Sequence, residues 1–74
     1  MADDRKWAVS IHATILRSSP SRHSTVICPV PGGIKLLVPE DYGEGWTKVK
    51  YKRTKKGDTR ILVGYIRNDN LMKV

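Results

Sequence analysis

Residues 46–52 read WTKVKYK, a stretch in which two kinds of side chain alternate. In an extended strand Trp46 shares one face with Lys48 and Lys50, and the residues between them share the other face. With Val49 directed into the core, Trp46 points outward beside two lysines. The stretch therefore predicts a β-strand with one buried and one exposed face.

The rest of the chain is also dominated by short segments typical of strands. No segment has a sustained helical period, and β-branched residues are frequent. The odd positions from 7 to 15 are apolar, which is typical of a strand with one buried face. Pro29 is expected to end the second strand, because proline has no amide hydrogen for a ladder. The expected strands are 7–15, 25–28, 34–38, 46–52 and 60–66, with a hairpin tip at 55–58 and a turn and last short strand in 67–74.

These segments predict an all-β fold in which five short strands form a small, strongly bent barrel. Closing the sheet would remove most exposed strand edges. The length of 74 residues supports one domain, and a chain this short buries only about 60% of its unfolded surface. A deep, dry catalytic pocket is therefore not expected. We expect residues 1–6 to be a flexible N-terminus and residues 7–74 to form the single domain.

Five short segments, taken in order over residues 8–74, resemble bacterial SH3 (SH3b, SH3-like) domains. They are 15–21, similar to the family's LNVRSGPS opening; 26–27, similar to its VIG strand; 31–33, similar to its KKG turn; 45–51, similar to GWYKVKY; and 64–66, similar to GWV or GYI. The resemblance implies a five-stranded SH3-like barrel with a short 3-10 turn before the last strand. It also implies a non-catalytic module that binds a peptide, either on a protein partner or in peptidoglycan.

Three positions depart from the family's pattern. Ser19 stands where the first loop usually has glycine. Arg67 and Asn70 stand at positions that match the proline and second tyrosine of the groove in eukaryotic relatives. Because recognition of proline-rich helices needs stacked aromatic walls, we do not expect this chain to bind them.

The resemblance places a ligand groove between residues 41–45 and residues 17–24. An outward indole flanked by charges commonly marks a binding surface, which makes Trp46 the main candidate. The alternatives are that a loop covers Trp46 as peripheral core, and that Tyr65 is buried with a satisfied hydroxyl. The acidic residues at 40, 41 and 44 are interpreted as solvated loop residues. The candidate ligand-binding residues are Tyr42, Trp46, Tyr65, Arg17 and Arg22.

The basic residues of the chain are concentrated in residues 48–60. This segment has seven basic residues and one acidic residue, so six of the seven net positive charges fall there. Such a block is either a solvated hairpin or an interaction surface. Phosphate neutralisation and stacking on the neighbouring rings of Trp46 and Tyr51 would give non-specific nucleic-acid binding. The residues of this alternative site are Lys48, Lys50, Lys52, Arg53, Lys55, Lys56 and Arg60.

The sequence does not favour catalysis, a metal site or a cofactor. His12 lies on the polar face of its strand and His23 in a serine-rich loop, and neither has a neighbour at metal-ligand spacing. Cys28 lies in a short apolar strand, the usual position of an inert buried thiol, and a single cysteine forms no internal disulfide. We therefore expect a binding domain without enzymatic activity.

The start of the chain lacks the apolar stretch of a signal peptide, which predicts a cytoplasmic protein. Location in the cell wall or in a virion, reached by another route, stays an alternative. No apolar run is long enough for membrane insertion. A structural subunit of a larger assembly, such as a phage particle, is a third function that fits the size. The oligomeric state does not follow from the sequence.

Overall fold

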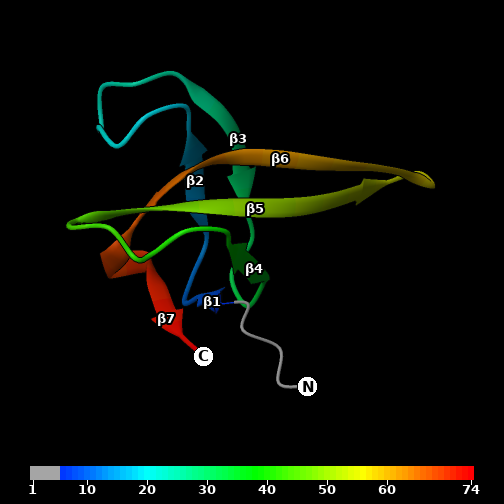
Figure 1. Ribbon diagram of the computed structural model, residues 1–74. Helices are drawn as coiled ribbons and strands as arrows, with labels where there is room; N and C mark the ends of the chain where they lie inside the picture. Colours follow the sequence, from blue (N-terminus) through cyan, green and yellow to red (C-terminus); the bar gives the residue numbers. More distant parts are fainter. Residues whose placement is uncertain (1–5) are drawn as a thin grey trace.

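A computed structural model describes residues 6–74 as one antiparallel sheet that curls into a half-barrel (Figure 1). Along the sheet the strands follow the order β3-β2-β6-β5-β4-β1-β7. The strands are β1 (Lys6–Ser10), β2 (Thr14–Arg17), β3 (Val26–Val30), β4 (Lys35–Val38), β5 (Trp46–Lys55), β6 (Asp58–Arg67) and β7 (Leu71–Lys73), with the 3-10 turn η1 (Asn68–Asn70) before β7.

The all-β class and the short 3-10 turn before the last strand are confirmed, but the strand count and the closure are not. The sheet has seven strands instead of five, and its end strands β3 and β7 do not pair with each other. One reason is that the expected strand 7–15 is interrupted at residues 11–13. Its first half, β1, pairs with β4 and β7, while its second half, β2, pairs with β3 and β6. Residues 1–5 of the expected flexible N-terminus lie outside the described residues, and Lys6 already belongs to β1.

The buried face of β1 is the opposite of the one its pattern predicts. Ala8 and Ser10 have no exposed surface, whereas Trp7 and Val9 of the expected inward face are only half-buried, and Ile11 and Ile15, which continue the pattern beyond β1, are 56% and 41% exposed. Burial of Ser10 is possible because its hydroxyl donates to Pro31 O at 2.7 Å and accepts from the Ile34 amide at 2.9 Å. These bonds tie β1 to the turn before β4.

Strand β3 continues through Pro29 to Val30, although Pro29 was expected to end it. Pro29 lies opposite Ile15 of β2. Because β3 is the end strand of the sheet, a residue without an amide hydrogen is tolerated there.

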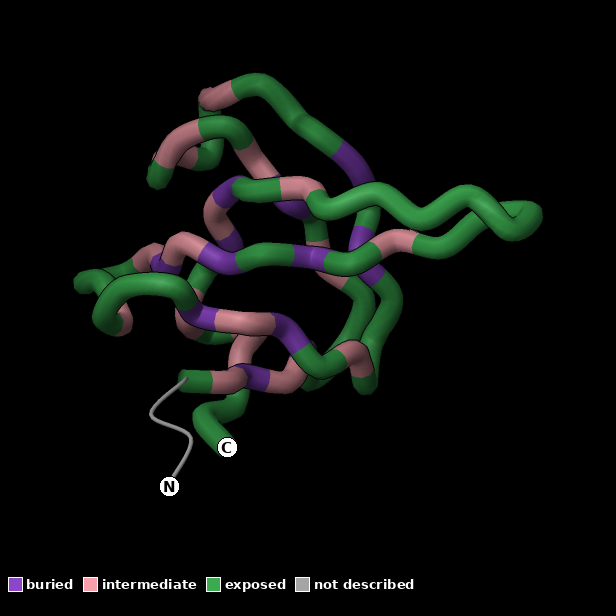
Figure 2. The backbone as a smooth tube through the Cα atoms, turned by 45° about the vertical axis from the view of Figure 1, so that its right-hand side comes forward, coloured by how far each residue is buried: buried purple, intermediate pink, exposed green. Residues whose placement is uncertain are grey.

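The buried apolar residues form one core cluster, and Figure 2 shows them spaced along the strands between less buried positions. Inward residues of β5 alternate as the sequence predicts, since Thr47, Val49 and Tyr51 are buried. Gly64 of β6 lets β2 cross closely, because a Cβ there would lie 2.6 Å from Arg17 O. The buried apolar residues are Ala8, Leu16, Cys28, Val30, Leu36, Val38, Val49, Tyr51 and Ile66.

Strands β5 and β6 form a hairpin that projects beyond the other strands (Figure 1). Each strand has ten residues and reaches the turn at Lys56-Gly57, so both are longer than predicted. Lys56 and Gly57 have φ angles of 51° and 80°, the pair of positive values that a two-residue type I′ turn requires. The predicted position of the hairpin tip is confirmed.

Candidate functional site

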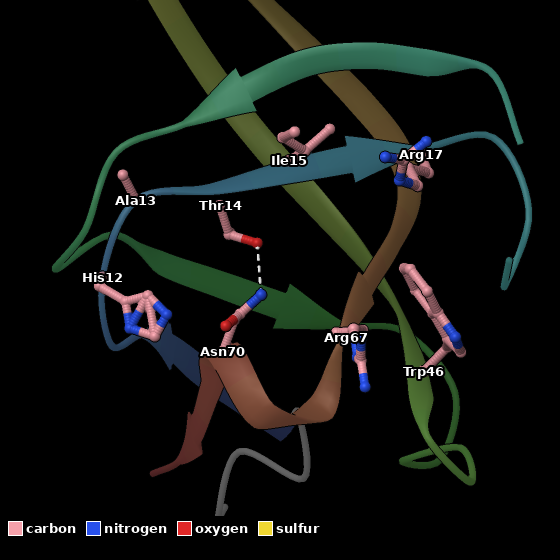
Figure 3. A pocket seen from close by; sticks show the side chains of 8 residues that line it. All are labelled: His12, Ala13, Thr14, Ile15, Arg17, Trp46, Arg67 and Asn70. Atoms are coloured by element: carbon pink, nitrogen blue, oxygen red, sulfur yellow. Dashed lines mark hydrogen bonds between the residues drawn. The ribbon is translucent and has the colours of Figure 1, made fainter. Parts of the chain in front are cut away.

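Two adjoining hollows meet at Trp46 and Arg67. We call them together the Trp46 groove. The first, about 390 Å³, runs along β2 to Trp46 (Figure 3) and is lined by His12, Ala13, Thr14, Ile15, Arg17, Trp46, Arg67 and Asn70. The second, about 260 Å³, is lined by Arg22, Gly45, Trp46, Arg67 and Asp69.

The hairpin base positions the indole. Trp46 and Arg67 are cross-strand partners at the first position of β5 and the last of β6. Gly45, with a φ angle of 77°, turns the chain into β5, and its carbonyl accepts a hydrogen bond from the Asn68 amide at 2.9 Å. The next pair, Thr47 and Ile66, is fully buried. Alternation along the strand therefore directs Trp46 away from the core, where it is half-buried.

Polar contacts hold the wall of the groove. Asn70 of η1 donates to Thr14 Oγ1 of β2 at 2.8 Å (Figure 3). Arg17 donates from Nη1 to Ser24 O at 2.7 Å, which anchors its guanidinium to the first loop. The groove walls thus come from β2, from η1 and from the base of the hairpin.

The Trp46 groove carries net positive charge. Arg67 Nη2 lies 3.5 Å from Asp69 Oδ2. Arg17 and Arg22 have no carboxylate partner anywhere in residues 6–74. Three arginines therefore surround the indole against a single aspartate, and Arg22 and Arg67 are the exposed ones.

The structure brings three of the five predicted ligand-binding residues together. Trp46, Arg17 and Arg22 line the groove, while Tyr42 and Tyr65 line neither hollow. Tyr42 packs against the core and donates its hydroxyl to Trp7 O at 2.7 Å, with Lys73 Nζ 4.6 Å from its ring centroid. Tyr65 is half-buried opposite Arg17 and Lys48.

Five polar or charged lining residues, Thr14 and the four named next, were not among the predicted ligand-binding residues. His12, Arg67, Asp69 and Asn70 become neighbours only because η1 folds against β2. The sequence offered a hint for two of them, because the resemblance to SH3 domains aligns Arg67 and Asn70 with groove positions of eukaryotic relatives.

The acidic loop before β5 is tied to lysines. Asp41 pairs with Lys6, and the hydrogen bond and charge of Lys6 lower the pKa of the Asp41 carboxyl below its ordinary value of 3.8. Glu40 Oε1 lies 3.2 Å from Lys48 Nζ. Two of the three acids interpreted as solvated are therefore in ion pairs, although their side chains remain largely exposed.

The basic residues of the hairpin are distributed over both of its faces. Lys48, Lys50 and Lys52 lie on the face of Trp46, and Lys48 is the one paired with Glu40. Arg53 and Lys55 lie on the opposite face, where Arg53 is the cross-strand partner of Arg60. A hollow of about 410 Å³ near the tip is lined by Arg53, Lys55, Lys56, Asp58 and Arg60.

The environment of Cys28 bears on catalysis, and that of Tyr51 bears on the stacking of nucleic-acid bases. Burial raises the pKa of the Cys28 thiol, and the charge of Arg53 opposes this in part. Tyr51, expected to offer a ring for base stacking, is only 8% exposed and belongs to the core. Within residues 6–74 no three His, Cys, Asp or Glu side chains are grouped as a metal site requires.

No helix in the described part of the chain is long and apolar enough for a membrane span. Comparison with protein-family models, with curated proteins and with solved structures finds no match to this chain.

Proposed function

We propose that this protein is a non-catalytic SH3-type binding module whose Trp46 groove holds an extended peptide segment carrying carboxylate groups. The observation that carries the proposal is the position of Trp46 between two adjoining hollows, with Arg17, Arg22 and Arg67 around it. The order of SH3-like segments along the chain also supports a binding module.

The chemistry of the groove suits an acidic peptide. A half-buried indole offers a large, rigid apolar surface, and tryptophan is enriched among residues that dominate binding energy. Guanidinium groups bind carboxylates through two parallel hydrogen bonds. Arg22 is exposed and has no carboxylate partner in the described chain, so its charge is available to a ligand. Arg17, anchored on Ser24, would hold a ligand carboxylate in a defined position.

The thiol environment supports a role without covalent chemistry. The thiolate is the nucleophilic form of cysteine, and a raised pKa reduces its population at neutral pH. Cys28 is buried among core residues and does not line the Trp46 groove.

A titration followed by NMR tests the proposal. The probe is a blocked decapeptide of alternating Glu and Leu, and its control has Gln in place of each Glu. We expect the Trp46 indole signal and the amides of 12–17, 22 and 67–70 to shift with the Glu peptide and much less with the Gln peptide. Trp7, which lies in β1 with Lys35 Nζ 4.6 Å from its ring centroid, is an internal reference that should not move.

A variant and a second probe complete the test. Arg22→Gln should weaken Glu-peptide binding about tenfold, the effect of losing one charge-assisted contact of about 1.4 kcal/mol. Lys35→Gln, which removes the same charge outside the groove, should change it less than twofold. Soluble peptidoglycan fragments in place of the Glu peptide separate a cell-wall ligand from a protein partner. Shifts confined to residues outside the groove would refute the proposal, and no response to any probe would favour a subunit of an assembly.

A further inference from the structure

The outer part of the hairpin is a two-stranded ribbon, and no other strand of residues 6–74 pairs with it. Strand β4 pairs with β5 only at Lys50, and β2 pairs with β6 only at Tyr65. Beyond Lys50, β5 continues for five residues to Lys55, or about 17 Å, and we call residues 50–61 the hairpin arm. Figure 2 shows the arm exposed along almost its whole length.

Positive charge covers both faces of the hairpin arm and its turn. Lys50 and Lys52 lie on one face, Arg53, Arg60 and Lys55 on the other, and Lys56 in the turn. The arm contains one acidic residue, Asp58, whose Oδ2 lies 3.4 Å from Arg60 Nε. The other five cations have no carboxylate partner among the residues that the structure describes.

We infer that the hairpin arm binds duplex DNA by lying in the major groove, where it neutralises phosphates on both walls. The major groove of B-form DNA is about 12 Å wide and admits a two-stranded β-ribbon. A ligand that contacts only one face of the arm would leave about half of these cations without a phosphate partner. The two walls of the major groove instead present phosphates to both faces of the ribbon. The hydroxyls of Thr54 and Thr59, 3.2 Å apart on the lysine face, add uncharged donors for phosphate oxygens.

The same observations disfavour other nucleic-acid ligands. Single strands are held by stacking on aromatic rings, and the hairpin arm offers none because Tyr51 belongs to the core. The A-form RNA major groove is too deep and narrow for side chains to read. Base readout favours arginine, and one of the two arginines of the arm, Arg60, is paired with Asp58. We therefore expect binding to depend on charge and groove shape and little on sequence.

Fluorescence anisotropy with a labelled DNA duplex of about 20 base pairs tests the inference. If the hairpin arm neutralises four phosphates, the affinity of the protein for the duplex should fall about 150-fold between 50 and 200 mM salt. The double variant Lys52→Gln/Lys55→Gln removes one exposed cation from each face and should reduce that fall to about 12-fold. The matched control Arg22→Gln/Arg67→Gln removes the same charge from the Trp46 groove and should keep the steep dependence.

Several results would overturn the inference. They are absence of binding at 50 mM salt, an equal effect of the two double variants, and equal affinity for an RNA duplex of the same sequence. Equal affinity for polyglutamate would instead assign the arm to an acidic protein partner. Such a partner would also contact the exposed side chain of Ile61, the cross-strand neighbour of Lys52. Amide shifts of the unaltered protein with DNA must map to 50–61, which keeps the test valid if a variant unfolds. The peptide titration uses another probe and another surface, so the two proposals fail separately.

Discussion

At the scale of single residues, burial follows hydrogen bonding as much as hydrophobicity. Ser10 occupies a fully buried position in β1 because its hydroxyl both donates and accepts a hydrogen bond. The larger apolar side chain of Ile11, next in the chain, is 56% exposed. A binary pattern of apolar and polar residues therefore assigns the wrong face to this strand.

The ion pair between Lys6 and Asp41 is a residue-level feature with a pH signature. Replacing Lys6 by Gln should raise the pKa of the Asp41 carboxyl towards its ordinary value of 3.8, because the main cause of its lowering is removed. Since the folded pKa is depressed, the stabilisation is complete above the unfolded pKa and is lost as pH falls through the folded pKa. Carbon-detected NMR titration of the Asp41 carboxyl measures the shift directly.

The control for this prediction is Lys55→Gln, which removes the same charge at the far end of the hairpin. This variant should leave the titration midpoint of Asp41 unchanged. An unchanged midpoint in Lys6→Gln would mean that the ion pair is not formed in solution.

At the scale of elements, the crossing of β2 over β6 depends on Gly64. A Cβ at this position would lie 2.6 Å from Arg17 O and 2.8 Å from Leu16 Cγ. Backbone cannot yield as a flexible side chain can, so the two strands would have to separate. This crossing joins the β3-β2 end of the sheet to the long hairpin and also brings Arg17 towards Trp46.

Gly64→Ala is therefore expected to destabilise the fold by about 2 kcal/mol, the cost of overpacking a tight contact. Gly57→Ala is the control, because a Cβ in that turn meets nothing within 4 Å and only the positive φ is strained, at about 1 kcal/mol. Urea unfolding gives both free energies. A smaller loss for Gly64→Ala than for Gly57→Ala would show that β2 and β6 are less closely packed than the structure has them.

The strands of the hairpin were predictable in pairing and face, but not in length. Alternation from Trp46 to Tyr51 assigns the buried face correctly, and the Lys56-Gly57 turn sets the register. Beyond Lys52 the polar residues give no alternation, so the sequence predicts that the strand ends there. The two-residue turn continues the ladder to Lys55 and Asp58 because it leaves no other residues for a loop.

At the scale of the whole molecule, an open half-barrel has two edges that a closed barrel would lack. One edge, β7, has only three residues, while the other, β3, has five and exposes Val26 and Ile27. Exposed edges can pair with other chains, and natural sheets protect them with short strands and proline. Pro29 in β3 fits this role, because it offers no amide hydrogen to a second strand.

Pro29→Thr should therefore increase self-association, because it restores a hydrogen-bond donor on an exposed β3 position. Sedimentation velocity of the variant and the unaltered protein at equal concentrations measures the difference. The control Pro20→Thr changes an exposed proline in the first loop, outside the sheet, and should have no effect. Identical sedimentation of both variants would show that Pro29 does not protect the edge.

The sequence by itself determined the all-β class, the hairpin with its tip, the outward direction of Trp46 and the concentration of charge in one segment. Each follows from local rules of alternation, turn chemistry and composition. Tertiary structure alone decided the break between β1 and β2, the buried serine, the open half-barrel and the meeting of His12, Arg17, Arg67 and Asn70 around Trp46. These depend on which distant strands pair and on which polar groups find partners, and no local pattern of residues encodes that choice.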